Sequence, residues 1–460
     1  MEQMLIHFAG EGSGVAEMSW GQLEIWGAMQ RQRTMMPLPL IEPLAPGTTL
    51  QDVADWLRYL LSRHQAMRTR LEPRPDGPPR QVLYSSGTIA IDVVEAGDDD
   101  PADVARRMLE WRDRYVECDY DVAREWPVFL TVITKDGVPS HRLITICHIV
   151  MDAFGAVALG ADLAERAAGG PGKPVTAMQP LAQAAWQQSP EGQRHSKAVL
   201  RHWEDVLRQM PASRFPAPVD QGEPRYWMSV FVSRATHLAV QIIRHRTGAP
   251  SAQVLLTMFL VALARVTGIN PSVTRVAVNN RFRRGMADSV SILTQYGLCM
   301  VDVAGITFDE ALARLGRRML ATLKNSYYDP LRVSELVQRV GRERGEEVDV
   351  HCYYNDRRLS PDADLTPGTL PTAAEVRAAL PFTSISHEPL AFAAERLFVA
   401  VEEAPDTFRL LLQADTHYLS QEAMVACARA MEDIAVQAAL DAAAPTGVPA
   451  PPDDAGTQPH

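Results

Sequence analysis

The sequence predicts a mixed α/β protein made of two units. Its 460 residues exceed what one ordinary hydrophobic core holds, so we expect two domains, or one unit of about 200 residues present twice as a pseudo-duplication. Hydrophobic residues make up 46% of the chain and charged residues 22%, which is typical of a globular protein. Strand-like and helix-like stretches alternate in both halves, which indicates the α/β class.

The first half contains the most regular of these patterns. A helix, two strands and a further helix precede the paired strands of WPVFLTVITKDGVPSHRLITICHIV, in which Asp136 and Gly137 predict a hairpin turn. The stretch AFGAVALGADLAERAAGG then has small apolar residues at helical spacing up to its Gly-Gly pair. His148 and Asp152 therefore lie in a predicted turn between a strand and a helix.

Residues 171–225 are rich in proline and contain the predicted domain boundary. We predict a first half at 1–185, a connecting segment at 186–225 and a second half at 226–443. In the second half WMSVFVS, TRVAVNN, LCMVDV, VDVHCYY, RLFVAVEE and RLLLQADTHYL read as strands, with helices from Ser251 to about Val266 and from about Gln421 to Leu440. The final stretch, APTGVPAPPDDAGTQPH at 444–460, has the composition of a disordered tail.

The charge balance limits the classes of partner. The chain has 45 basic and 56 acidic residues, a net charge of −11, which argues against a general nucleic-acid binder. Two local basic clusters remain, RFRRG (Arg281, Arg283, Arg284) and RVGRERG (Arg339, Arg342, Arg344). The N-terminal residues do not resemble a signal peptide, and the longest apolar run, VLLTMFLVALA, is too short to span a bilayer. We therefore expect a cytoplasmic protein.

The cysteines do not suggest a disulfide framework or a metal site. There are five of them, scattered and without CxxC spacing: Cys118, Cys147, Cys299, Cys352 and Cys427. Disulfide-stapled domains and zinc sites have closely spaced cysteines. We expect free, mostly buried thiols.

His148 is the first candidate for chemistry. The strand LITIC runs directly into this histidine, and Asp152 follows four residues later. An imidazole has an ordinary pKa near neutrality, so it can take a proton from an attacking amine or hydroxyl and return it later. Asp152 either orients the ring or holds the turn in shape. An isolated HxxxD pattern is also compatible with a purely structural histidine.

Four further stretches accompany CHIVMDA in the order and spacing of a known family. They are MSWGQLEIW (Ser19, Gln22, Trp26), LSRHQAMRTRL (Arg63, His64, Arg68, Thr69), VAVNNRFRRG and YGLCMVDV. Together they resemble the core motifs of condensation domains of nonribosomal peptide synthetases, relatives of chloramphenicol acetyltransferase and of the plant BAHD acyltransferases. The resemblance extends from about Ser19 to Leu440.

The resemblance implies a fold and a site. Members of the family have two chloramphenicol-acetyltransferase-like α/β halves in a V-shaped pseudo-dimer, with a central tunnel that two phosphopantetheine arms enter from opposite faces. His148 matches the second His of their HHxxxDG motif, which faces the tunnel, and is the implied catalytic group together with Asp152. The motif Asp usually pairs with an Arg, which here is Arg281. No metal or organic cofactor is implied beyond the phosphopantetheine arm of a carrier protein.

The remaining motif residues receive weaker assignments. Arg63 and Arg68 are predicted to be structural hydrogen-bond donors rather than substrate contacts, and Trp26 to be part of the core. Candidates for lining the tunnel are Cys147, Ala153, Ser19, Gln22, Tyr296 and Asn355.

Several positions depart from the family pattern. Cys147 replaces the first motif His; on a strand it points away from His148, so we expect it to pack inside the first half and not to act as a nucleophile. Ala153 replaces the motif Gly and narrows the space beside the histidine. The Asn of the usual FVNT stretch is absent, since this region reads LTQYG, and the YxDFAxW region survives only as LAQAAW. His148 itself argues against the heterocyclization subfamily, which has Asp there.

The function implied by the resemblance is that of a free-standing condensation enzyme of natural-product biosynthesis. It would form an amide or ester between an acyl thioester on a carrier protein supplied in trans and an amine or alcohol acceptor, and we expect a monomer. Two alternatives are an acyltransferase that uses coenzyme A thioesters, and a catalytically degenerate condensation fold that serves as a docking platform for another enzyme. Carrier proteins of this kind are typically acidic, so the arginine clusters are candidates for a docking face.

Overall fold

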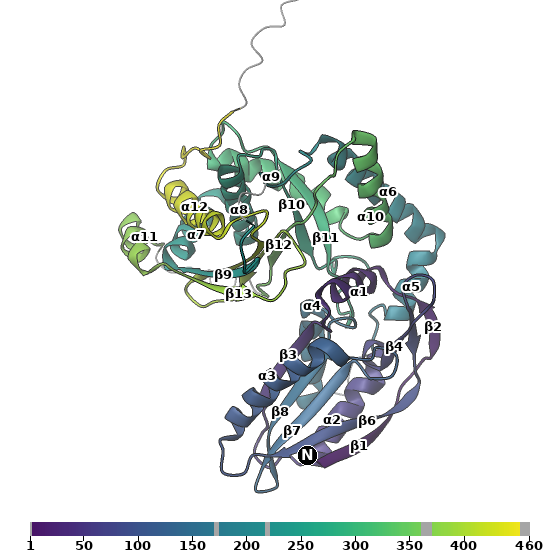
Figure 1. Cartoon of the computed structure of the whole chain (residues 1–460). Coiled ribbons are helices and arrows are strands. Elements are labelled where there is room, and N and C mark those ends of the chain that lie inside the picture. The colour runs from purple at the N-terminus through teal and green to yellow at the C-terminus, as the bar shows by residue number, and fades with distance from the viewer. Residues whose placement is uncertain (1, 170–173, 217–220, 360–369, 451–460) are drawn as a thin grey trace, which may run out of the picture. The chain divides into compact units, whose positions relative to one another are not determined.

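The computed structural model describes residues 2–169, 174–216, 221–359 and 370–450 (Figure 1). They form two compact units. The first contains Met1–Lys197, Asn279–Gln295 and Asp329–Leu331; the second contains Ala198–Val278, Tyr296–Tyr328 and Arg332–His460. These units differ from the predicted halves, because the connecting segment is divided between them and the first unit takes residues 279–295 from the second half of the sequence.

The first unit is built on a five-stranded sheet with the order β1-β6-β7-β8-β3. Its strands are β1 (Glu2–Ala9), β6 (Ser86–Glu95), β7 (Val128–Lys135), β8 (Val138–Cys147) and β3 (Pro37–Pro43), and only β6 and β7 pair in parallel. The predicted hairpin is confirmed: β7 pairs with β8 across Asp136 and Gly137, which have φ of 51° and 75°. Two positive φ angles in succession are what a tight hairpin of this hand requires.

Helices cover both faces of this sheet. Ile144 and Ile146 of β8 pack in one core with α2 (Leu50–Arg63), while Leu143 packs in a smaller cluster with Val104 of α3 (Pro101–Asp119). Successive side chains of a strand alternate between faces, so the two helices lie on opposite sides of the sheet. The remaining elements of the unit are α1 (Trp20–Gln32), η1 (Gln65–Arg68), α4 (Ala153–Ala167), α5 (Pro180–Gln188), the first residues of α6 (Pro190–Gln209) and the small sheet β2 (Gly14–Glu17), β5 (Arg80–Leu83), β4 (Thr69–Glu72).

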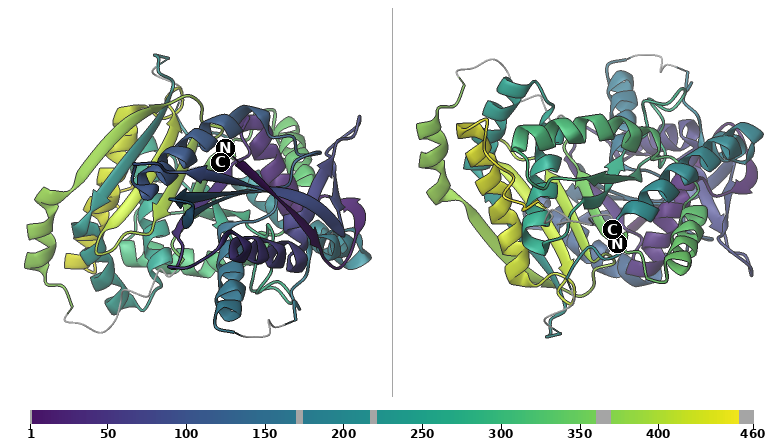
Figure 2. Two further views of the ribbon diagram at one scale, coloured as in Figure 1. Left: turned by 90° about the horizontal axis from the view of Figure 1, so that it is seen from below. Right: turned by 90° about the horizontal axis from the view of Figure 1, so that it is seen from above.

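The second unit is built on a seven-stranded sheet with the order β11-β10-β12-β14-β15-β9-β13. The strands are β9 (Tyr226–Ser233), β10 (Ser272–Val278), β11 (Gln295–Val301), β12 (Cys352–Asp356), β13 (Ser384–Leu390), β14 (Leu397–Glu402) and β15 (Phe408–Asp415). The helices are α7 (Arg234–Thr247), α8 (Ser251–Thr267), α9 (Phe308–Lys324), α10 (Pro330–Arg344), α11 (Ala373–Ala379) and α12 (Gln421–Leu440), with the turn η2 (Leu380–Phe382). The yellow helix α12 lies against α7 and α8 beside this sheet (Figure 2).

Helix α8 is the centre of this second core. Residues 254–264 are all buried, including Phe259, whose ring stacks on Tyr354 of β12 with centroids 5.4 Å apart. This is the apolar run VLLTMFLVALA of the sequence. Within the described ranges no single helix is long and apolar enough to cross a membrane. Helices α7 and α8 taken together have the length and composition of a membrane-spanning segment, but the chain bends by 112° between them.

The predicted disordered tail is wrong for residues 444–450. Ala444 and Val448 are buried, and their carbonyl groups accept hydrogen bonds from the backbone of Phe308 and Gly305 at 2.9 Å each. Thr446 is also buried and donates from its hydroxyl to the carbonyl of Val303 at 2.7 Å. Composition misled the prediction because three small or apolar residues are sufficient to anchor a Pro-rich segment. Residues 451–460 lie outside the described part of the chain.

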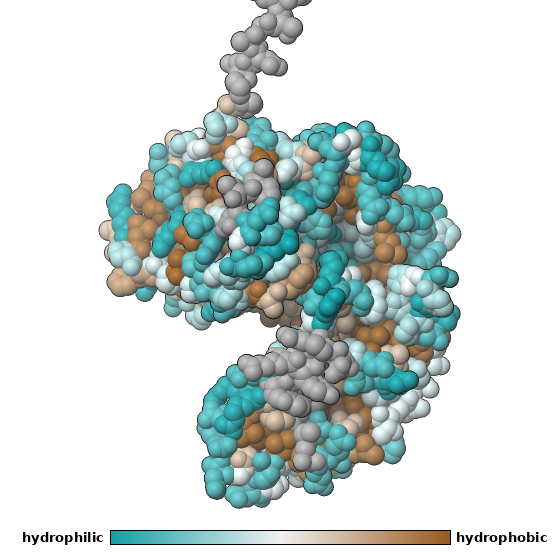
Figure 3. Space-filling model, in the orientation of Figure 1, coloured by the Kyte–Doolittle hydropathy of each residue, from teal (hydrophilic) through white to brown (hydrophobic). Residues whose placement is uncertain are grey.

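On the face drawn in Figure 3, hydrophilic residues alternate with apolar patches.

Arginines of one of the two predicted basic clusters form ion pairs with glutamates. Arg339 of α10 forms ion pairs with Glu204 at 2.9 Å and Glu343 at 3.0 Å, and Arg344 pairs with Glu346 at 2.6 Å. The RVGRERG cluster is therefore part of a mixed charge network rather than a uniformly positive face.

Candidate functional site

The predicted turn between strand and helix is confirmed at His148. Strand β8 ends at Cys147, and α4 begins at Ala153. In between, the amide of Val150 donates to the carbonyl of Cys147 at 3.2 Å, and that of Met151 donates to His148 at 3.4 Å. The chain therefore reverses tightly within the five residues that carry the motif, all in the first unit.

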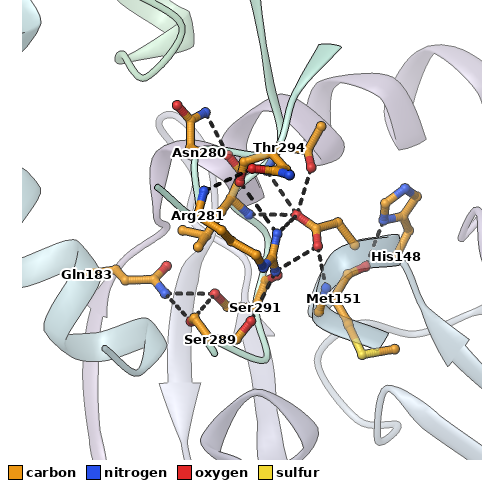
Figure 4. Close-up of polar contacts among 12 residues, drawn as sticks. His148, Met151, Gln183, Asn280, Arg281, Ser289, Ser291 and Thr294 are labelled. Carbon is orange, nitrogen blue, oxygen red and sulfur yellow. Dashed lines mark hydrogen bonds and ion pairs between the residues drawn. The ribbon is translucent and has the colours of Figure 1, made fainter. Parts of the chain in front are cut away.

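The ring of His148 is half-buried, and Figure 4 shows its contact with Met151. Its Nδ1 lies 2.8 Å from the backbone carbonyl oxygen of Met151. A carbonyl oxygen only accepts hydrogen bonds, so Nδ1 carries the hydrogen, and in the neutral ring the basic lone pair is on Nε2. The turn thus selects the tautomer and the orientation in which Nε2 can act as a base.

Asp152 caps the helix that follows. Its Oδ1 accepts a hydrogen bond from the amide of Gly155 at 2.8 Å, the usual function of an aspartate at a helix N-cap. Its Oδ2 accepts three more, from the amides of Leu293 and Thr294 and from the Thr294 hydroxyl, each at 2.9 Å. The carboxylate is only 3% exposed and does not contact the His148 ring through any of these bonds. It therefore holds the turn rather than orienting the imidazole directly.

Arg281 supplies the counter-charge, as the resemblance implies. Its Nη2 lies 2.8 Å from Oδ1 of Asp152, and its Nη1 lies 3.1 Å from Oδ2. Burial alone would raise the pKa of Asp152, but the charge and hydrogen bonds of Arg281, with the backbone amides, outweigh it and lower that pKa below its ordinary value. We call Asp152, Arg281 and the amides of Leu293 and Thr294 the clamp.

The clamp fastens residues 279–295 onto the first unit. Gly155 is a position of close approach: a Cβ there would lie 3.1 Å from the Ser291 carbonyl oxygen and 3.2 Å from Arg281 Nη2. A Cβ at Gly21 would lie 2.3 Å from the Ile292 carbonyl oxygen. The prediction missed Leu293 and Thr294, because backbone donors leave no pattern in the sequence.

Cys147 does not line an open space, which corrects its place among the tunnel candidates. The side chain is fully buried in the core beside Met35, whose carbonyl oxygen lies 3.4 Å from the sulfur. Burial raises the pKa of the Cys147 thiol to about 12, despite smaller opposing effects of hydrogen bonds with Ile149 and Tyr120. The expected packing inside the first half is therefore what the structure shows.

We predict that Cys147 resists alkylation. With a thiol pKa of about 12 and no exposed surface, almost no thiolate is available to a reagent at pH 8. Iodoacetamide followed by peptide mapping is expected to leave Cys147 unmodified in the native chain and to modify it in urea. Modification at equal rates in both states would contradict this packing.

Ser19 and Gln22 also have a different role from the predicted one. Both are nearly fully buried and form a capping box at the start of α1: the amide of Ser19 donates to Gln22 Oε1 at 2.8 Å, and the amide of Gln22 donates to Ser19 Oγ at 3.3 Å. The pattern Ser-x-x-Gln is a recognised signature of this motif, so the capping box could have been predicted from the sequence.

Replacing Ser19 with alanine is expected to cost about 1 kcal/mol of unfolding free energy, because the cap loses its acceptor. Urea denaturation checks this value, with Ser19→Thr as the variant that keeps the hydroxyl. A large loss of turnover without loss of stability would instead show that Ser19 contacts a substrate.

Arg63 and Arg68 occupy structural positions. Arg63 forms a bidentate pair with Asp162 of α4 at 2.8 and 2.9 Å. Arg68 is 1% exposed and donates only to backbone carbonyls, those of Leu61, Gly12, Tyr84 and Glu11. It thereby ties the end of α2 to the segment between β1 and β2.

The other candidates are less constrained. Ala153 is exposed at the first turn of α4, and Trp26 is half-buried against the core of the first unit. Tyr296 and Asn355 belong to the second unit, where the ring of Tyr296 packs edge-on to Tyr353 at 4.8 Å. Their place beside His148 remains a prediction. Among the described residues no group of three or more His, Cys, Asp or Glu side chains is arranged to hold a metal ion.

Comparison with known proteins identifies relatives over most of the chain. The family model of the condensation domain matches residues 28–350. AMB antimetabolite synthetase AmbB of Pseudomonas aeruginosa is 26% identical over 370 residues, which are 76% of this chain and 28% of that protein. Nonribosomal peptide synthetase kk1B of Curvularia clavata is 26% identical over 300 residues, 60% of this chain and 2% of that protein. The chain thus spans only a small part of the length of these relatives.

Solved structures share the fold at low sequence identity. The X-domain from teicoplanin biosynthesis has a TM-score of 0.68 and 16% identity, with 96% of this chain and 99% of that chain covered. SgcC5 of Streptomyces globisporus has a TM-score of 0.65 and 16% identity, covering 93% and 100%. A structure on condensation-domain-mediated chain release from the enacyloxin polyketide synthase has a TM-score of 0.67 and 18% identity, covering 93% and 83%. The predicted chloramphenicol-acetyltransferase-like α/β fold is confirmed. Because the family match extends far beyond the His148 turn, the chain belongs to the condensation-domain family.

Proposed function

We propose that the chain forms an amide or an ester between an acyl group held as a thioester on a carrier protein and an amine or alcohol acceptor. The observation that carries this proposal is the fixed ring of His148, whose Nδ1 is bound to the Met151 carbonyl at 2.8 Å so that Nε2 is the basic nitrogen. The half-buried ring is thereby oriented with its basic nitrogen opposite the bonded one, as a general base requires.

The proposed reaction uses His148 as a general base. Nε2 takes the proton of the acceptor N–H or O–H as its nitrogen or oxygen attacks the thioester carbonyl carbon. The new C–N or C–O bond forms, the C–S bond breaks, and the proton passes from His148 to the departing thiolate. Asp152 and Arg281 take no part in this transfer and keep the turn in place.

The donor is proposed to arrive on an acidic carrier protein in trans. Of the two basic clusters, RFRRG without the buried Arg281 is the better candidate for its docking face, because Arg284 and Phe282 are exposed, the latter by 60%, and Arg283 lies over the Phe282 ring at 5.4 Å. The arginines of RVGRERG are largely paired with glutamates. Opposite charge at a docking face mainly accelerates association.

A second candidate function is a docking platform without turnover. The departures Cys147 and Ala153 favour it, as does the similar fold of the X-domain from teicoplanin biosynthesis, which has been solved as a complex with OxyB. In this case the chain would bind a carrier protein or a tailoring enzyme while His148 stayed chemically idle.

Turnover assays separate these functions. The chain is incubated with an acyl-loaded carrier protein and a panel of amines and alcohols, and products are read by mass spectrometry; the same acyl group on coenzyme A is the parallel donor. Product formed from the carrier-bound acyl group, but not from the same acyl group on coenzyme A, supports the proposal. Equal product from both donors indicates a coenzyme A-dependent acyltransferase. Carrier binding without product, from a folded chain, indicates the docking platform.

A further inference from the structure

Helix α5 contains a buried glutamine that the proposed reaction does not use directly. Gln183 is fully buried, and its Nε2 lies 2.7 Å from Ser291 Oγ, 3.0 Å from Ser289 Oγ and 2.9 Å from the carbonyl oxygen of Met178 (Figure 4). The two hydroxyl groups also contact each other at 2.8 Å, and that of Ser289 donates to Met178. Gln183 therefore fixes residues 289–291 from the side of α5.

The same two serines hold Arg281 through their backbone. Nη2 of Arg281 donates to the carbonyl oxygens of Ser289 at 3.0 Å and Ser291 at 3.1 Å, and the same nitrogen contacts Asp152. The guanidinium is planar and its donors have fixed directions, so its orientation toward Asp152 depends on where those carbonyls lie. The hydroxyl groups of the two serines therefore contact Gln183, whereas their carbonyl oxygens accept hydrogen bonds from Arg281.

The clamp connects these serines to the turn that contains His148. Asp152 accepts from Arg281 and from the amides of Leu293 and Thr294, a few residues beyond the serines, and it caps α4 directly after the turn. His148 lies in that turn and is bound to its Met151 carbonyl. Every contact in this series, from Gln183 to His148, is between residues of the first unit.

We propose that Gln183 is a positioning residue for His148, acting through Ser289, Ser291, Arg281 and Asp152. Its effect on turnover rests on the proposed function, whereas its effect on the His148 ring does not. Gln183 stands in LAQAAW, the stretch that departs from the aromatic pattern of the family.

The chain offers a matched control in Gln81 of β5. It is also fully buried in the first unit and donates from Nε2 to two backbone carbonyls, those of Glu17 at 2.9 Å and Pro180 at 3.3 Å. Its Oε1, like that of Gln183, is buried and has no hydrogen-bond partner among the described residues. None of its bonds reaches residues 279–295. Gln81→Leu and Gln183→Leu therefore remove the same chemical groups, but only the second change releases the serines.

The test combines a spectroscopic and a kinetic measurement. In chain labelled with ¹⁵N-histidine, the His148 resonances are assigned by their absence in His148→Ala. Gln183→Leu is expected to shift the ¹⁵N signals of the His148 ring and lower kcat about tenfold with KM for the donor changed less than twofold, while Gln81→Leu changes neither. If Gln183→Leu does not fold, Ser291→Ala removes the 2.7 Å contact with Gln183 together with the 2.8 Å contact with Ser289 Oγ, and it is expected to shift the same signals in the same direction.

The outcomes distinguish this proposal from the proposed function. Unchanged His148 signals in folded Gln183→Leu, or equal changes in Gln81→Leu, would overturn the positioning role. A wild-type chain without turnover, in which Gln183→Leu still shifts the His148 signals selectively, would refute the proposed reaction and leave the positioning role standing.

Discussion

Replacing His148 with alanine is expected to lower the rate of product formation by about a hundredfold or more, the usual contribution of a positioned general base. The loss should appear in kcat, because proton transfer occurs in the transition state rather than on binding. The ring is half-buried at the end of β8, and its bond to Met151 connects neighbouring residues of one turn. The variant should therefore fold, with circular dichroism and melting behaviour close to those of the wild type.

His141 provides the control for this experiment. It is a half-buried histidine of the same strand β8, and its Nδ1 contacts only the neighbouring Ser140 hydroxyl at 3.4 Å among the bonds the structure defines. His141→Ala is expected to change turnover less than about twofold. If His148→Ala instead formed product at the wild-type rate, His148 would not be the base, and the reaction would depend on positioning of the donor and acceptor alone.

The sequence predicted the motif turn well because its pattern is local. A continuous apolar run that forms a buried strand, an aspartate at the N-cap position and a helix of small residues are neighbours in the chain, and each follows from short-range rules. The pairing of Asp152 with Arg281, 129 residues apart, came only from the resemblance. Nothing in the spacing or composition of either residue indicates it.

The remaining parts of the site were beyond such rules. Ser289, Ser291 and Gln183 are ordinary polar residues whose roles depend on two segments, α5 and residues 279–295, meeting in space. Ser19 and Gln22 show the opposite error: a local capping box was interpreted as part of a substrate site, because the motif context was given more weight than the short-range signal. Local patterns therefore fixed the elements here, while the long-range polar contacts required the fold.

Asp152→Ala is expected to destabilise the first unit by about 3–5 kcal/mol, because it leaves the Arg281 charge buried without its partner. The side chains of this pair are 4% and 9% exposed. The change also removes the acceptor of the Leu293, Thr294 and Gly155 amides, and buried donors without acceptors are costly. Urea denaturation followed by tryptophan fluorescence measures the loss. Glu17→Ala, which breaks the more exposed Arg74 pair, is the control and should cost less than about 1 kcal/mol.

The pH dependence gives an independent check on the charge of Asp152. Its pKa is lowered in the folded chain, so its contribution to stability is present at neutral pH and is lost as the pH falls below the ordinary carboxyl value, about 4, toward the folded value. Asp152→Asn keeps the size of the side chain and removes the titration. The stability difference between wild type and Asp152→Asn should therefore be large at pH 7 and shrink in acid. A difference that stays constant from pH 7 to pH 3 would mean that the hydrogen-bonded shape of the cap, and not its charge, holds residues 279–295 in place.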